Sequence, residues 1–140
     1  MKYLALPLTI AVAFSTGALA DKKPKISLTA NPAMGMSPAR VVVTADISGI
    51  TDDNEEFYCP TIEWEWGDDT RSNNSADCDP YVAGKTEVKR RFAADHTFQS
   101  AGEYRVIFRL KKKDKVVGVG NTVVRVRPGL GDGGDGRGGH

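Results

Sequence analysis

The 140-residue sequence predicts an all-β fold, a sandwich of two antiparallel sheets. Apolar residues alternate with polar ones in several short runs, which is typical of half-buried strands. Residues that favour turns separate these runs. No helical period of any length follows the first 20 residues. Short strands divided by turns are typical of a β-sandwich domain of about 100 residues.

Two strands are predicted before residue 50. Ile26, Leu28 and Ala30 alternate with polar neighbours, and residues 41–47 alternate in the same way. Pro32 and Pro38 lie between the two runs and predict turns. An acidic run at 52–56 ends the second strand in a loop.

The next predicted strand has a large aromatic face. Ile62, Trp64 and Trp66 point inward, whereas Glu63 and Glu65 point outward. The Gly-Asp-Asp sequence that follows predicts a turn.

The second half of the chain predicts three further strands. Residues 72–80 are polar and predict a loop, after which Val88 and Phe92 indicate a strand with little pattern. Residues 104–110 alternate clearly. The last strand covers 116–127, with a bulge near Gly118 or Gly120 where the alternation shifts.

Both ends of the chain differ from this pattern. Lys2, the apolar run 3–14 and Ala18-Leu19-Ala20 predict a Sec-type signal peptide, residues 1–20, cleaved before Asp21. The mature chain is then secreted, periplasmic or at the cell surface, with no predicted membrane span. Residues 128–140 are mostly glycine and predict a disordered tail.

The charge balance argues against one class of partner. The chain has 19 basic and 18 acidic residues, and Lys2 is the only charged residue of the signal segment. The mature chain is therefore close to neutral. Nucleic-acid binding needs a net basic surface that releases counterions, so no nucleic-acid partner is predicted.

The two cysteines predict a disulfide. Cys59 and Cys78 both lie in the exported part of the chain, where disulfides form and persist. Closing this loop stabilises a small domain by about 3 kcal/mol in the loop-entropy model. No histidine or further cysteine lies at metal-ligand spacing, so a metal site is not predicted there.

Two segments resemble the PKD (polycystic kidney disease) domain family. Residues 62–70, IEWEWGDDT, resemble the family motif aromatic-x-Trp-Asp-Phe-Gly-Asp-Gly-Thr. His96-Thr97-Phe98 with residues 101–106, AGEYRV, resembles His-Thr-Tyr-x-x-Pro-Gly-x-Tyr-x-Val. The likeness covers about 26–127. It implies an immunoglobulin-like β-sandwich over residues 21–127 and a non-catalytic extracellular module.

The sequence departs from the family pattern at several positions. Glu65 replaces Asp, Trp66 replaces Phe, Asp69 replaces Gly and Ala101 replaces Pro. The Asp69 position implies a differently shaped turn. The two cysteines are not part of the family core. Because no buried aromatic residue is lost, the predicted fold is unaffected.

The motif residues are interpreted as structural. The indoles fill the space between the sheets, the Asp68 carboxylate holds its turn, and the Tyr104 phenol reaches back to a loop carbonyl as in a tyrosine corner. His96 is interpreted as a structural turn residue, not a catalytic one. The set comprises Trp64, Trp66, Gly67, Asp68, His96, Phe98, Gly102 and Tyr104.

The outer face of one sheet is predicted to be charged. In a sandwich of this type the strand at 104–110 lies between the strands at 62–66 and 116–127. Arginines would then lie beside Glu63 and Glu65. The simpler interpretation is a solvated charge ladder, and the alternative is an anion-binding face. Its candidates are Arg105, Arg109, Arg125 and Arg127.

Calcium is a further candidate ligand. Asp52 and Asp53 lie in one acidic loop, and Asp68 and Asp69 lie in another. Calcium needs six to eight converging oxygens, whereas these loops are expected at opposite ends of the sandwich. No metal or cofactor is therefore predicted.

The sequence predicts no catalytic residues. The predicted function is binding of an extracellular protein or polysaccharide, adhesion, or a structural spacer. The alternative is a small secreted enzyme or enzyme inhibitor, which would need a concave pocket with converging polar groups.

Overall fold

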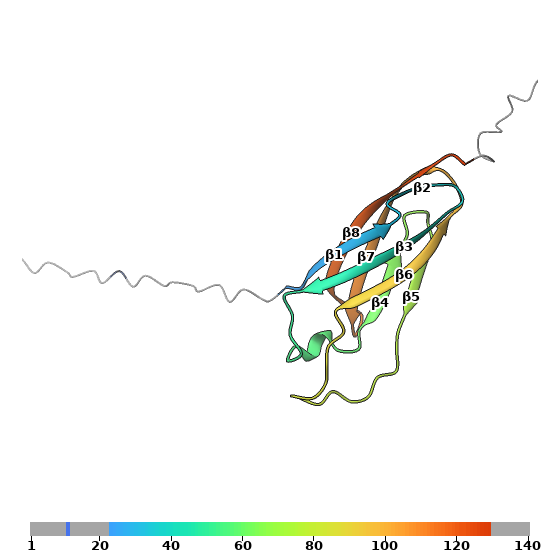
Figure 1. Cartoon of the computed structure of the whole chain (residues 1–140). Coiled ribbons are helices and arrows are strands. Elements are labelled where there is room, and N and C mark those ends of the chain that lie inside the picture. Colours follow the sequence, from blue (N-terminus) through green and yellow to red (C-terminus); the bar gives the residue numbers. More distant parts are fainter. Residues whose placement is uncertain (1–10, 12–22, 130–140) are drawn as a thin grey trace, which may run out of the picture.

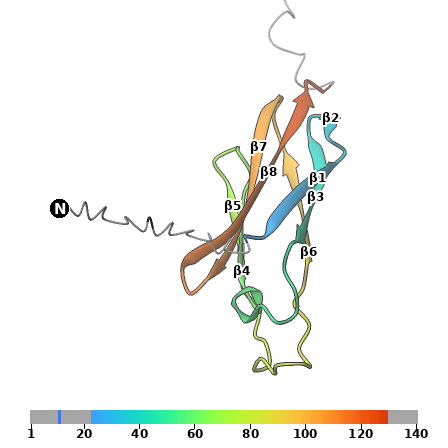
Figure 2. The same ribbon diagram turned by 90° about the vertical axis from the view of Figure 1, so that its left-hand side faces the viewer.

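The computed structural model describes Ala11 and residues 23–129, which form a two-layer β-sandwich. This confirms the predicted fold class. Most of the predicted signal segment, and residues 130–140 of the predicted tail, lie outside the described residues. Figure 2 shows the two layers from the side.

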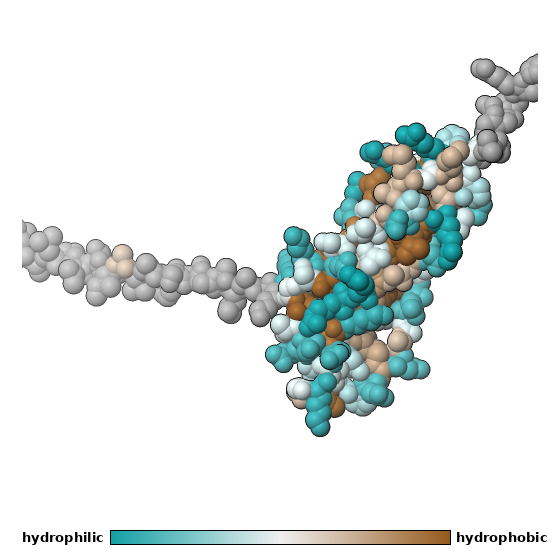
Figure 3. Space-filling view, viewed as in Figure 1, coloured by the Kyte–Doolittle hydropathy of each residue, from teal (hydrophilic) through white to brown (hydrophobic). Residues whose placement is uncertain are grey.

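The first sheet has three strands, in the order β1-β3-β6. They are β1 (Lys25–Asn31), β3 (Ala39–Ser48) and β6 (Arg91–Phe98). Both neighbouring pairs are antiparallel. Figure 3 shows the outer face of this sheet, where hydrophilic side chains surround a few separate apolar patches.

The second sheet has five strands, in the order β2-β8-β7-β4-β5. They are β2 (Met34–Met36), β8 (Lys115–Arg127), β7 (Gly102–Lys112), β4 (Thr61–Glu65) and β5 (Arg71–Asn74). One turn of 3-10 helix, η1 (Glu55–Phe57), precedes β4. No helix in the described part of the chain is long and apolar enough to cross a bilayer.

The core lies between the inner faces of the two sheets. Trp64 and Trp66 stack with ring centroids 5.4 Å apart, and Phe108 packs edge-on against Trp64 at 4.8 Å. The predicted inner face of β3 is fully covered. The alternating pattern therefore identified the core correctly, because successive strand residues point to opposite faces. The main buried residues of the core are Val41, Val43, Ala45, Trp64, Trp66, Phe98, Val106, Phe108, Leu110 and Val124.

One side of the sandwich is closed by β1 packing against β8. A Cβ on Gly120 would lie 2.7 Å from Ile26 Cγ2 and 3.1 Å from Ile26 Cβ, so a side chain here would push β1 away from β8. The predicted bulge is present beside Gly118. The β7–β8 register shifts after Leu110, which leaves Val117 as the extra residue.

The opposite side of the sandwich is open. β5 and β6 form the two sheet edges there, and no hydrogen-bonded ladder joins them within residues 23–129. The chain enters at the end with the β7–β8 turn, and β8 finishes at the end with β2 (Figures 1 and 2).

Several local expectations were wrong. β5 overlaps the start of the predicted loop 72–80, and β2 forms between the two prolines. Because β2 pairs with β8 in the parallel sense, the sandwich is not wholly antiparallel. Val88 is buried but lies outside any strand, and β6 begins only at Arg91. β5 is exposed on both faces and β2 has three residues, so neither shows an alternating pattern.

Candidate functional site

The charged outer face of the five-stranded sheet follows from the strand register. Residues paired in an antiparallel ladder share a face. Glu63 lies opposite Arg109, Glu103 opposite Arg125, and Arg105 opposite Val123. The predicted arrangement of β7 between β4 and β8 is confirmed.

The half of this face that contains Glu63 and Glu65 is called here the acidic half, and neighbouring basic side chains neutralise both carboxylates. Arg109 donates hydrogen bonds to Glu63 at 2.9 Å and to Glu65 at 2.8 Å, and Lys111 donates to Glu63 at 2.5 Å. Glu63 is only 7 % exposed. The Lys111 hydrogen bond outweighs burial and holds the pKa of Glu63 below its ordinary value. The Glu65 hydrogen bond raises the pKa of Arg109. Arg109 is therefore occupied by carboxylates.

The other half of the face remains basic. The Arg105 guanidinium donates to the Asn121 amide oxygen at 3.0 Å, and no carboxylate among residues 23–129 lies within ion-pair distance of it. Arg125 has only a 3.7 Å contact with Glu103, with both side chains exposed. Arg127 is exposed at the end of β8.

Large apolar side chains are exposed among these arginines. Met34 and Met36 of β2 lie beside Arg125 and Arg127 in the parallel ladder, and they are 47 % and 57 % exposed. We call this surface the β8 face. It consists of Arg105, Arg125, Arg127, Met34 and Met36.

The four arginines predicted to bind anions therefore lie in two different parts of this face. Arg109 lies in the acidic half, whereas Arg105, Arg125 and Arg127 lie on the β8 face. The apolar members of the face were missed in the sequence. The two methionines lie in a strand too short to show a pattern.

The first family-like motif forms a clasp across the open side of the sandwich. His96 Nε2 lies 2.7 Å from Asp68 Oδ2, and the imidazole stacks on Trp66 with centroids 4.6 Å apart. The Thr70 amide and hydroxyl both donate to Asp68 Oδ1. We call this group the Asp68–His96 clasp. His96 lies within β6 and not in a turn, so that expectation was wrong.

The clasp also affects the titration of Asp68. Burial acts to raise the pKa of this carboxyl, but hydrogen bonds from His96 and Thr70 outweigh it and lower the pKa. The clasp therefore favours the ionised carboxylate. One imidazole nitrogen of His96 contacts Asp68, and one face of its ring stacks on Trp66. These contacts indicate a structural role for His96.

The second motif has the geometry of a tyrosine corner. The Tyr104 hydroxyl donates to the Ser100 carbonyl at 2.6 Å, four residues upstream. Phe98, which is fully buried, stacks on the Tyr104 ring at 4.5 Å. A Cβ on Gly102 would lie 3.3 Å from the same ring. The motif therefore fixes the β6–β7 connection.

The calcium candidates are not brought together. The Asp52 carboxylate accepts from the Val88 amide and from Arg90, both at 2.9 Å, whereas Asp68 belongs to the clasp. Within the described residues, no group of three or more His, Cys, Asp or Glu side chains could hold a metal ion.

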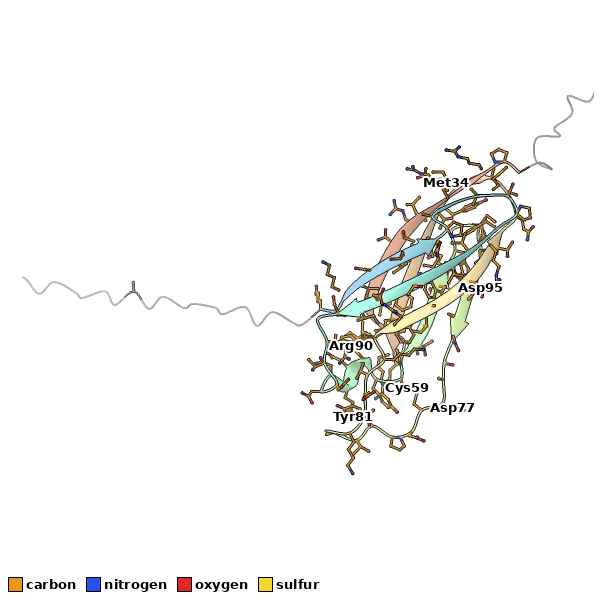
Figure 4. All side chains as sticks on the ribbon, in the orientation of Figure 1. Met34, Cys59, Asp77, Tyr81, Arg90 and Asp95 are labelled. Atoms are coloured by element: carbon orange, nitrogen blue, oxygen red, sulfur yellow. A yellow bond between two sulfur atoms is a disulfide. The ribbon has the colours of Figure 1, made fainter. Side chains whose placement is uncertain are left out.

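The predicted disulfide is present at the end of the sandwich opposite β2. Figure 4 shows Cys59 and Tyr81 at this end and Met34 at the other. Cys59 and Cys78 join the start of β4 to the segment after β5. The Tyr58 hydroxyl donates to the Asp79 carbonyl and the Tyr81 hydroxyl to the Asp52 carbonyl, both at 2.5 Å. Burial raises the pKa of Tyr81, and nearby Asp53 adds to this effect.

Two cavities lie at this end of the molecule, and His96 lines neither of them. A cavity of about 180 Å³ borders the disulfide, between Tyr58 and Phe92. A more open and more polar depression of about 310 Å³ lies between Lys23, Glu56 and Lys115.

Comparisons with known proteins agree with this architecture. The PKD domain of an M14-like peptidase from Thermoplasmatales archaeon SCGC AB-540-F20 is similar, with 19% identity and a TM-score of 0.50. The alignment covers 74% of this chain and 92% of that domain. The chain therefore has a PKD-like, immunoglobulin-like β-sandwich fold.

Two structures of a CARDB domain from Pyrococcus furiosus are also similar. One, solved in complex with di-metal ions, has 11% identity and a TM-score of 0.46, over 76% of this chain and 94% of that one. The solution NMR structure has 13% identity and a TM-score of 0.45, over 75% and 94%. Neither a protein-family model nor a curated protein sequence matches the chain.

Proposed function

We propose that this protein is an exported, non-catalytic binding module that uses the β8 face to hold a negatively charged extracellular partner. The observation that carries the proposal is the set of three arginines and two exposed methionines on one outer face of the five-stranded sheet. Partner molecules with carboxylate or sulfate groups, either protein or polysaccharide, fit this surface.

The chemistry of arginine supports this assignment. A guanidinium presents several donors in a rigid plane that matches a carboxylate or sulfate, and it is less strongly hydrated than an ammonium group. Arg105 and Arg127 have no carboxylate within ion-pair distance among residues 23–129. They can therefore bind an anion without first breaking an internal ion pair.

The apolar neighbours add a second source of affinity. Met34 is 47 % exposed and Met36 is 57 % exposed. Methionine adapts its shape to different surfaces. Arginine and methionine are both enriched where proteins bind partners. This combination of arginines and exposed apolar side chains favours a binding surface over a purely solvated charge ladder.

Export is the second part of the proposal. Residues 1–20 have the sequence of a Sec-type signal peptide. The Cys59–Cys78 disulfide supports an oxidising compartment, since disulfides rarely persist in the cytosol. The alternative of a small secreted enzyme gains nothing from His96, because Asp68 and Trp66 already contact its ring.

A charge-reversal experiment tests the proposed face. Arg105→Glu with Arg127→Glu should weaken retention on immobilised heparin and lower the salt concentration at elution, because binding to polyanions is electrostatic. Arg40→Glu with Arg91→Glu is the matched control. It changes the net charge equally but lies on the other sheet.

The control variant also shows which result would contradict the proposed binding face. If both double variants elute at the same reduced salt concentration, retention follows net charge alone and the β8 face is not a site. A column with immobilised acidic peptide in place of heparin separates protein partners from polysaccharide partners.

A further inference from the structure

The cavity beside the disulfide has the composition of an anchor pocket. Its walls are the Tyr58 and Phe92 rings, Pro60, Ile62 and the disulfide itself. Asn74, Glu87 and Lys89 are exposed at the rim. We call this cavity the disulfide pocket. Pockets that recognise ligands combine an apolar interior with a few polar groups at the edge.

Several contacts hold the disulfide pocket open. The Cys59–Cys78 bond fixes the two segments that form one wall. The Tyr58 ring is held by its hydroxyl on the Asp79 carbonyl, and Lys112 donates to the Tyr58 carbonyl at 2.5 Å. The Lys89 ammonium lies over the Phe92 ring, 4.9 Å from its centroid. A pre-formed pocket binds with less loss of conformational entropy.

The volume of the pocket matches one large side chain. A dry cavity of about 150 Å³ lined by apolar side chains binds benzene. The disulfide pocket, at about 180 Å³, can therefore hold a phenyl ring or a leucine side chain. All polar side chains that line it are at the exposed rim, so its interior offers little to the hydroxyl groups of a sugar ring.

A free strand edge leads to the pocket. β5 pairs with β4 alone among the described strands, so the backbone groups of its other edge are open to a further strand. Asn74, the last residue of β5, lines the pocket, and so does Ala76 two residues later. An extended peptide added to an edge uses main-chain hydrogen bonds for affinity and pockets for specificity.

The surroundings of the pocket are acidic. Asp77 and Asp79 alternate with the lining residues Ala76 and Cys78, and all four are exposed or half-buried. Glu87 adds a third carboxylate at the rim. Figure 4 shows Asp77 on the loop beside this end of the sandwich. Two basic residues also lie here, but each is held over a ring of the pocket wall. Lys89 lies over Phe92 at 4.9 Å and Lys112 lies over Tyr58 at 5.9 Å. A basic partner is therefore complementary in charge.

We propose that the disulfide pocket binds an extended peptide segment of a protein partner, with a phenylalanine-sized or leucine-sized side chain in the pocket and lysine or arginine beside it. The backbone of this segment continues the five-stranded sheet beyond β5. This site is separate from the β8 face, has the opposite charge and is independent of the function proposed for that face.

Three synthetic peptides test the proposal. Acetyl-Lys-Thr-Phe-Thr-Lys-amide should give saturable amide shifts in NMR spectra of the full chain, confined to β5 and the pocket. Replacing its phenylalanine with alanine should weaken binding by about tenfold or more, since the buried ring is lost. Replacing both lysines with glutamates should also weaken binding, most at low salt.

Variants of the protein locate the binding. Ala76→Leu places a larger side chain into the cavity and should weaken binding of the lysine–phenylalanine peptide by about tenfold or more. Ala83→Leu, an equally exposed change in the same loop outside the pocket lining, should leave binding unchanged. Both alanines are on the surface, so both variants should fold.

Three results would overturn the proposal. They are equal binding of the alanine peptide, equal binding by the Ala76→Leu variant, and an absence of saturable shifts. Shifts at the pocket on addition of a neutral glucoside, without any from the peptides, would instead identify a carbohydrate site. Heparin retention of the Ala76→Leu variant should stay normal, which separates failure of this site from failure of the β8 face.

Discussion

Gly67 shows why the turn after β4 requires glycine. Its φ angle is +86°, in the left-handed region that disfavours other residues. A Cβ at this position would also lie 2.7 Å from the Arg105 carbonyl oxygen. Backbone conformation and close backbone contact therefore exclude any side chain. The contact brings the turn against β7 and positions Asp68 for its partner on β6.

Gly84 is a matched control for this residue. It has a φ of +80°, but a Cβ there would have nothing within 4 Å. Gly84→Ala should cost about 1 kcal/mol from backbone strain alone. Gly67→Ala should cost about 3 kcal/mol or more, because the Arg105 backbone must also move. Urea denaturation measures both, and equal losses would contradict the proposed backbone contact.

The Asp68–His96 clasp joins two elements that share no backbone ladder. The turn between β4 and β5 supplies the carboxylate, and β6, in the other sheet, supplies the imidazole. Because the pKa of Asp68 is lowered in the folded state, the unfolded chain takes up the proton first as pH falls. The stabilisation is thus present above the ordinary carboxyl pKa of 3.8 and disappears below it.

This linkage predicts the behaviour of Asp68→Asn. At neutral pH the variant should be less stable than the wild type by about 1–3 kcal/mol. The difference should shrink as pH falls through the range in which Asp68 takes up its proton. Asp69→Asn, at an exposed neighbouring position, should show little difference at any pH. A stability gap for Asp68→Asn that stays constant down to pH 2 would exclude the clasp as its source.

Strands with one buried face could be predicted from sequence, and strands without one could not. β3 and β7 bury alternate residues, and β4 directs Ile62 and Trp64 into the core, although Glu63 is buried on its outer face. The positions and inner faces of these strands were therefore predicted correctly. β5 is exposed on both faces, and β2 depends on its pairing with β8. Their formation depends on neighbouring strands rather than on local pattern.

The same distinction applies to the candidate sites. The order of β4, β7 and β8 could be inferred, and it predicted that the arginines share one outer face. The residue register could not be inferred, and it pairs Arg109 but not Arg105 with a glutamate of β4. The disulfide followed from the number of cysteines. The disulfide pocket could not be predicted, because residues 75–90 have no regular pattern and approach Phe92 only in the folded chain.

At the scale of the whole molecule, the two candidate surfaces are separate and opposite in charge. The β8 face is basic and extends toward the end with β2, whereas the disulfide pocket lies at the other end among acidic residues. The protein could thus hold an anionic surface and a basic peptide at the same time. Binding at one site should not alter affinity at the other.

Removal of the disulfide tests this independence. Cys59→Ser with Cys78→Ser should lower the free energy of unfolding by about 3 kcal/mol, since it frees a loop with a sequence separation of 19. Peptide binding at the disulfide pocket should be lost, because the disulfide forms part of the pocket wall. Heparin retention at a temperature where the variant stays folded should persist. Parallel loss of both would show that the two surfaces depend on each other.

The short parallel pairing of β2 with β8 has a mechanical consequence. The chain enters at one end of the sandwich and leaves at the other (Figure 1). Backbone hydrogen bonds from the Arg125 amide to the Ala33 carbonyl and from the Ser37 amide to the Arg127 carbonyl join β8 to the residues that flank β2. Tension on the two ends would slide β8 lengthwise past β2 and load these bonds together, rather than peel them apart in turn. These hydrogen bonds should therefore raise the force at which the sandwich unfolds when it is pulled along its axis.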